Sequence, residues 1–147
     1  MYDNIIFFMP SGSKSPVKQP QFSTKNILDF FDAPNKNIMI VADSSIFPFT
    51  RKLANEFGVD FDPQGSKVTD GNGEHKIVAT DIISESDSIF APTKGITYQG
   101  IGLKIDPKNN YAFSLLKADN KVYSIGENGN VVNEAPAIVA AYQVIIL

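Results

Sequence analysis

Continuous apolar runs alternate with amphipathic segments in the first part of the chain. Residues 4–9 and residues 37–41 are both unbroken apolar stretches after their first asparagine, and the second is rich in β-branched side chains. Runs of this length and composition are typical of strands buried on both faces. Between them, Ser23 or Thr24 precedes apolar residues at helical spacing and is placed to cap the first amides of a helix. The pattern therefore predicts strand, helix and strand in that order.

A second amphipathic segment follows residues 37–41 and predicts a second helix. Ser44 or Ser45 can cap its first amides, and Pro48 is tolerated in its first turn. The apolar residues spaced four apart are Phe49, Leu53 and Phe57. That spacing places them on one helical face over the sheet, and Gly58 is a typical helix end. Alternating strands and helices predict an open sheet with right-handed crossovers.

After Asp62 the pattern changes to short strands separated by turns. The strand-like pieces are residues 67–70, 76–80, 121–125 and 137–147. Residues 96–105 also read as a strand, interrupted by two glycines, and residues 110–117 are predicted to form a short helix. We therefore expect a single α/β domain over residues 1–147, with a Rossmann-like, mostly parallel open sheet and a more β-rich C-terminal half. Because the chain opens and closes on apolar runs, we expect it to be a fragment of a longer protein.

Composition and charge narrow the range of partners. The net charge is −3 at pH 7, and the 13 Lys and Arg residues are scattered rather than clustered. Nucleic acids and anionic membranes bind to surfaces where basic residues are clustered, so neither is expected as a partner. No membrane contact is expected from this segment. The chain has no cysteine, which excludes a disulfide framework, a cysteine nucleophile and a thiolate metal site.

Few residues offer catalytic chemistry. His75 is the single histidine and follows a Gly-Asn-Gly turn, so we expect it in an exposed loop rather than in a metal or Ser-His-Asp site. A phosphate loop would place glycines between a strand and a helix, whereas the turn after residue 41 has none. We predict no catalytic residue, no metal site and no cofactor in this domain.

One crevice is a candidate ligand site because of its position. Asp43, Ser44, Ser45 and Arg51 follow a predicted central strand, and open α/β sheets bind ligands at the carboxyl ends of their strands. The structural alternative is that a serine caps the helix, Asp43 favours the helix dipole and Arg51 is solvated.

Nine segments, taken together and in order, resemble the 48 kDa subunit family of oligosaccharyltransferase. The segments are residues 2–8, 37–45, 51–62, 67–70, 75–81, 89–92, 98–103, 106–116 and 137–143. The resemblance implies an α/β domain on the luminal side of the endoplasmic reticulum, in a parent protein with a single membrane anchor. It also implies an accessory, non-catalytic scaffold role in a complex that transfers a preassembled glycan from dolichyl diphosphate to Asn-X-Ser/Thr sequons. The partners implied are the other subunits, and the divalent metal belongs to a different, catalytic subunit.

Two other functions stay open at this point. The first is a carbohydrate-binding module that recognises the glycan donor at the crevice, with Phe47 or Phe49 as an aromatic platform. The second is an unrelated α/β hydrolase, in which a serine nucleophile would need His75 as its base.

Overall fold

The computed structural model describes residues 2–8, 23–70, 77–79, 81–82, 96–118 and 120–143. The helices are α1 (Thr24–Phe31) and α2 (Pro48–Glu56). The strands of the first half are β1 (Asn4–Phe8), β2 (Asn37–Val41), β3 (Val59–Phe61), β4 (Lys67–Thr69), β5 (Ile77–Ala79) and β6 (Asp81–Ile82). Those of the second half are β7 (Ile96–Tyr98), β8 (Leu103–Ile105), β9 (Ala112–Lys117), β10 (Tyr123–Ile125), β11 (Val131–Glu134) and β12 (Ala137–Tyr142). Neither described helix is long and apolar enough to cross a membrane.

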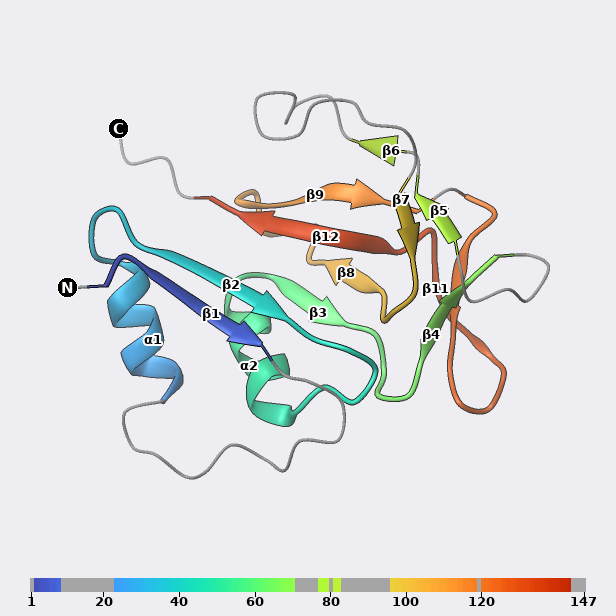
Figure 1. Cartoon of the computed structure of the whole chain (residues 1–147), viewed down its shortest axis with the longest axis horizontal. Helices are drawn as coiled ribbons and strands as arrows, with labels where there is room; N and C mark the ends of the chain where they lie inside the picture. The colour runs from blue at the N-terminus through green and yellow to red at the C-terminus, as the bar shows by residue number, and fades with distance from the viewer. Residues whose placement is uncertain are drawn as a thin grey trace.

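The predicted fold class is wrong, because the described chain is mainly antiparallel β structure. Only β1 and β2 pair in parallel, in register from Asn4 opposite Asn37 to Phe8 opposite Val41. The other described strands form antiparallel sheets in the orders β3-β8-β12-β9-β6, β11-β10-β4 and β5-β7. A Rossmann-like sheet needs helical crossovers throughout, and both helices that the structure describes lie before β3 (Figure 1).

The local elements of the first part agree with the sequence patterns. Ser23 caps α1, and its hydroxyl accepts a hydrogen bond of 3.2 Å from the amide of Asn26. Pro48 occupies the first turn of α2, and Gly58 follows that helix in the left-handed region with φ of 73°. The predicted cap of α2 is wrong, because Phe47 takes the cap position and no side chain caps the helix.

The helix predicted at residues 110–117 is also wrong. Residues 112–117 form β9, which pairs with β12 on one side and with β6 on the other. The backbone hydrogen bonds of a strand are made with residues that are distant in sequence, so the local sequence pattern does not predict them. The exposed loop predicted for His75 lies outside the described residues.

Two clusters of buried side chains form the core that positions the rest of the chain. The first contains Val68, Leu116, Ala118, Val122 and Ile138, with Tyr98 packed against it. The second contains Ile46, Ala54, Phe61, Ile101, Leu103 and Ala137. Helix α2 also contacts the β1–β2 pair, where the rings of Phe7 and Phe49 lie 6.4 Å apart. The segment after β2 and the turn after β3 are thus both anchored in the core.

Candidate functional site

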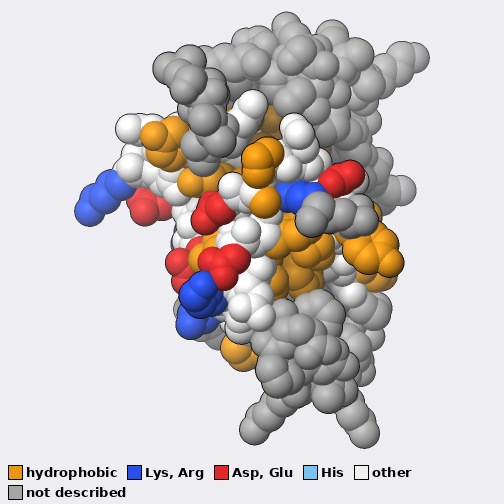
Figure 2. All heavy atoms as spheres, turned by 90° about the vertical axis from the view of Figure 1, so that its left-hand side faces the viewer, with side chains coloured by type: hydrophobic (Ala, Val, Ile, Leu, Met, Phe, Trp, Pro, Cys, Tyr) orange, Lys and Arg blue, Asp and Glu red, His pale blue; other side chains and the backbone are white. Residues whose placement is uncertain are grey.

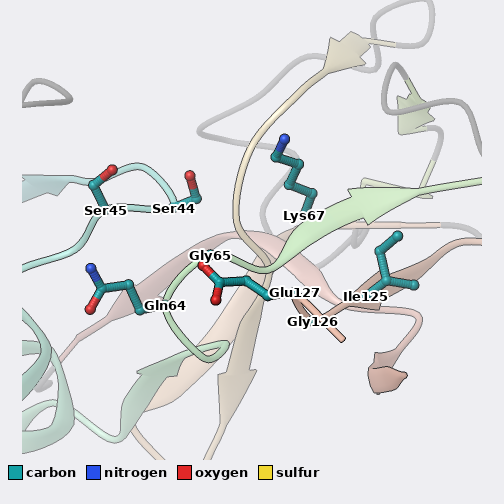
Figure 3. A pocket seen from close by; sticks show the side chains of 8 residues that line it. All are labelled: Ser44, Ser45, Gln64, Gly65, Lys67, Ile125, Gly126 and Glu127. Atoms are coloured by element: carbon teal, nitrogen blue, oxygen red, sulfur yellow. The ribbon is translucent and has the colours of Figure 1, made fainter. Parts of the chain in front are cut away.

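A polar pocket of about 500 Å³ lies where three chain turns meet (Figure 3). The first turn follows β2, the second joins β3 to β4, and the third joins β10 to β11. The residues that line the pocket are Ser44, Ser45, Gln64, Gly65, Lys67, Ile125, Gly126 and Glu127. Its volume lies within the range of pockets that hold small ligands.

Backbone and side-chain hydrogen bonds hold the first two turns together. The amide of Gly65 donates to the carbonyl of Ser44 over 2.8 Å, which ties the β3–β4 turn to the end of β2. Asp43 accepts a hydrogen bond of 2.7 Å from the amide of Ser45 and so shapes the turn. Gly65 has φ of 81°, a conformation that favours glycine. The shape of this part of the pocket therefore depends on hydrogen bonds and backbone conformations within the two turns.

The lining groups suit a neutral, hydrogen-bonding ligand better than a strongly charged one. Ser44 and Ser45 supply hydroxyls, and Gln64 supplies an amide that both donates and accepts. The charged side chains, Lys67 and Glu127, have opposite signs and offset each other. In Figure 3 the carboxylate of Glu127 lies across the middle of the pocket, close to Gly65. A sugar or another polyhydroxylated compound matches this mixture of donors and acceptors.

The structure separates the four predicted site residues. Ser44 and Ser45 line the pocket, whereas Asp43 does not line it and accepts the hydrogen bond of the Ser45 amide. Arg51 does not line this pocket. Phe47 and Phe49, which we considered as an aromatic platform, do not line it either, and its apolar side chain is Ile125.

Arg51 instead joins α2 to the strand that follows it. Its guanidinium lies 2.7 Å from the carboxylate of Asp60, donates to the carbonyl of Phe61, and donates over 2.5 Å to the carbonyl of Asp62. The side chain is 27% exposed, so these bonds are partly shielded from water. This arrangement differs from the structural alternative of the sequence analysis, in which Arg51 is solvated, because the guanidinium is bound to protein groups.

Replacing Arg51 by methionine is expected to destabilise the chain by about 1–3 kcal/mol, because partly buried carbonyl groups lose a charged donor. The measurement is the free energy of unfolding from guanidinium titration followed by circular dichroism. The control is Lys25→Met, which removes an exposed ion pair with Asp29 on α1 and should change stability by less than about 1 kcal/mol. Equal losses in the two variants would contradict the role assigned to Arg51.

Sequence reasoning found only Ser44 and Ser45 among the residues that line the pocket. Gln64, Lys67 and Glu127 come from turns and a strand start that the sequence pattern does not bring near residues 44–45. The closeness of the turn after β10 to the β3–β4 turn depends on the pairing of β10 with β4. That pairing joins residues more than fifty positions apart, and no local signal reports it.

A second group of polar side chains is buried beside Gly102. The carboxylate of Asp62 is 1% exposed and accepts a hydrogen bond of 2.9 Å from Asn133. Its other oxygen and the hydroxyl of Ser124 have no hydrogen-bond partner within the described structure. Both lie over Gly102, where a side chain would collide with them. Burial, together with the charge of Asp62, raises the pKa of Tyr98 to about 12.

The raised pKa of Tyr98 predicts a loss of stability at alkaline pH. The ordinary pKa near 10 applies in the unfolded chain, so below pH 10 both states keep the proton and stability is unaffected. Between pH 10 and 12 only the unfolded state releases it, which lowers the free energy of unfolding by about 1.4 kcal/mol per pH unit. Urea unfolding at pH 9, 10 and 11 checks this slope. In Tyr98→Phe the slope should be shallower, and identical slopes would refute the assignment.

Within the residues that the structure describes, no three His, Cys, Asp or Glu side chains are grouped so as to hold a metal ion. His75, around which a serine hydrolase would have to be built, lies outside those residues. The chemistry visible at the described site is therefore hydrogen bonding.

Comparison with known proteins identifies similar sequences along the whole chain. Residues 1–146 match the family model described as OST48, N-terminal domain. The 48 kDa subunit of dolichyl-diphosphooligosaccharide–protein glycosyltransferase from Arabidopsis thaliana is 30% identical over 136 residues, covering 84% of this chain and 30% of the relative. The proteins of the same name from Danio rerio and Caenorhabditis elegans are 27% and 28% identical, again over 84% of this chain. The chain spans about 30% of the length of each of these relatives.

Proposed function

Because this chain belongs to the OST48 N-terminal domain family, we propose that it is a non-catalytic accessory domain of oligosaccharyltransferase. The relatives are named as subunits of an enzyme that transfers a glycan from dolichyl diphosphate to protein. In this proposal the domain lies on the luminal side of the endoplasmic reticulum and holds partner subunits. The observation that carries the proposal is the family match over residues 1–146. The resemblance of the ordered sequence segments supports it independently of the fold class.

The test is affinity purification of the tagged protein from membranes of the organism that makes it, followed by mass spectrometry. Recovery of other subunits of the glycosyltransferase, in amounts comparable to the bait, is the expected result. A protein recovered without them would overturn the proposal. The non-catalytic part is tested separately, because the purified chain alone should transfer no glycan from a dolichyl diphosphate donor to a sequon peptide.

A second candidate function is carbohydrate binding, which the lining of the polar pocket favours. Hydroxyl, amide and charged groups from three turns converge on a volume of about 500 Å³, and such a mixture can bind several sugar hydroxyls at once. Titration with the free oligosaccharide, followed by NMR, should then shift the amide signals of Ser45 and Gly126. Glu127→Gln should weaken the binding. Unchanged signals at millimolar oligosaccharide would remove this candidate.

A further inference from the structure

An apolar groove of about 450 Å³ separates β2 from β12. Its lining includes five consecutive residues of each segment, Ile38–Ala42 and Ile138–Tyr142. Phe31 and Phe57 also line it, and their rings pack against each other and against Tyr142 at 5.1–6.0 Å. Seen from the left of Figure 1, where β2 begins and β12 ends, hydrophobic side chains gather in the middle of the surface with charged ones beside them (Figure 2).

Both strands that border the groove have an open edge toward it. β2 pairs only with β1 among the described strands, so no described strand forms backbone hydrogen bonds with its other edge. β12 pairs with β9 along its length, but with β8 only through Ala137 opposite Leu103. Beyond Ala137, the edge of β12 on the β8 side has no partner strand within the described residues. Alternate backbone amides and carbonyls of a strand point to each edge, so each of these edges presents unpaired polar groups.

The combination of open strand edges and apolar side chains indicates which kind of ligand the groove can bind. A small apolar molecule would cover the side chains but would leave the backbone groups of both edges without partners. An extended polypeptide donates and accepts along both of its edges, as in recognition by strand addition. Because β2 and β12 run in opposite directions (Figure 1), such a strand would be parallel to one and antiparallel to the other. Either arrangement forms a regular ladder.

We propose that the groove receives a β-strand from the part of the family polypeptide that lies outside the matched region, joining the β1–β2 pair to the five-stranded sheet. The relatives contain enough additional sequence for such a strand, since the chain spans only about 30% of the length of each of them. Five residues of strand, about 17 Å, would pair with Ile38–Ala42. The inserted strand is apolar, because the exposed side chains of Met39 and Val139 border its path. This inference rests on the family match and not on the proposed scaffold role.

The experiment uses overlapping twenty-residue synthetic peptides that cover the Arabidopsis relative outside its matched region. Each fluorescently labelled peptide is titrated with the purified chain, and binding is followed by anisotropy. We expect an apolar peptide from this set to bind and to slow hydrogen exchange at least tenfold at backbone amides of both residues 38–42 and residues 138–142. The same peptide with alternate backbone nitrogens methylated should not bind, because it cannot complete the ladder.

Two matched variants distinguish the groove from other edges of the protein. Val139→Lys places a charge beside the inserted strand and should weaken peptide binding at least tenfold. Val131→Lys changes another exposed valine, on β11 and outside the groove, and should leave binding unchanged. The proposal is overturned if no peptide of the set binds, if the bound peptide protects other amides instead, or if both variants bind as the original chain does. Failure here leaves the co-purification result unaffected, so the two proposals fail separately.

Discussion

Replacing Gly102 by alanine is expected to destabilise the chain by about 3 kcal/mol or more, at the upper end of what overpacking causes. A Cβ atom at this position would lie 2.2 Å from the Asp62 carboxylate, 2.5 Å from the Ser124 hydroxyl and 2.7 Å from Pro136. All three neighbours are nearly or fully buried. Asp62 is also held through its other oxygen by Asn133, so a Cβ atom at residue 102 would have to displace side chains that are packed in the interior.

The measurement is the free energy of unfolding from guanidinium titration of the original chain and the variant. Gly126→Ala is the matched control, because there the nearest atoms to a new Cβ are the Asn128 side chain at 3.2 Å and Val132 at 3.4 Å. We expect that control to lose no more than about 1 kcal/mol. A Gly102 variant within 0.5 kcal/mol of the original would show that the Asp62–Ser124–Pro136 contact is not as tight as described.

The role of Gly102 also illustrates what the sequence could and could not predict. The sequence pattern associates this glycine with a bulge or a close backbone approach, and the close approach is what the structure has. The neighbours that make it close could not be named, because Asp62, Ser124 and Pro136 come from separate segments. The contact depends on antiparallel pairing of β3 with β8 and of β10 with β4. Local patterns identify strands, whereas pairing is decided by packing between distant residues.

The same distinction explains the error in fold class and the partial prediction of the site. Residues 4–62 contain strand, helix, strand and helix as predicted, and the parallel pair β1–β2 is the one region where the α/β expectation holds. From Val59 onward, short strands with turns between them pair antiparallel. Ser44 and Ser45 could be found from their place after β2. Lys67 and Glu127 could not, since strand pairing alone brings them to the pocket.

Replacing Leu53 by alanine should cost about 3 kcal/mol of stability, within the usual range for truncating a buried leucine. Leu53 is fully buried, and it is the middle residue of the apolar face predicted for α2. Alanine is at least as good a helix former as leucine, so the intrinsic stability of the helix is not lowered by the change. The loss therefore reports the packing of α2 on the strands and not the stability of the isolated helix.

Guanidinium unfolding of Leu53→Ala and Lys52→Ala separates these two contributions within one turn of α2. Lys52 is exposed, so its replacement should change the free energy of unfolding by no more than about 0.5 kcal/mol. Retention of stability in Leu53→Ala would mean that the surroundings collapse into the space left by the side chain. Both side chains hold α2 against the rest of the chain. Leu53 does so by packing in the core, and Arg51 by donating to the carbonyls of Phe61 and Asp62. That outcome would therefore also weaken the stabilising role assigned to Arg51. A large loss in Leu53→Ala together with a smaller one in Arg51→Met would instead show that burial contributes more than the polar anchor.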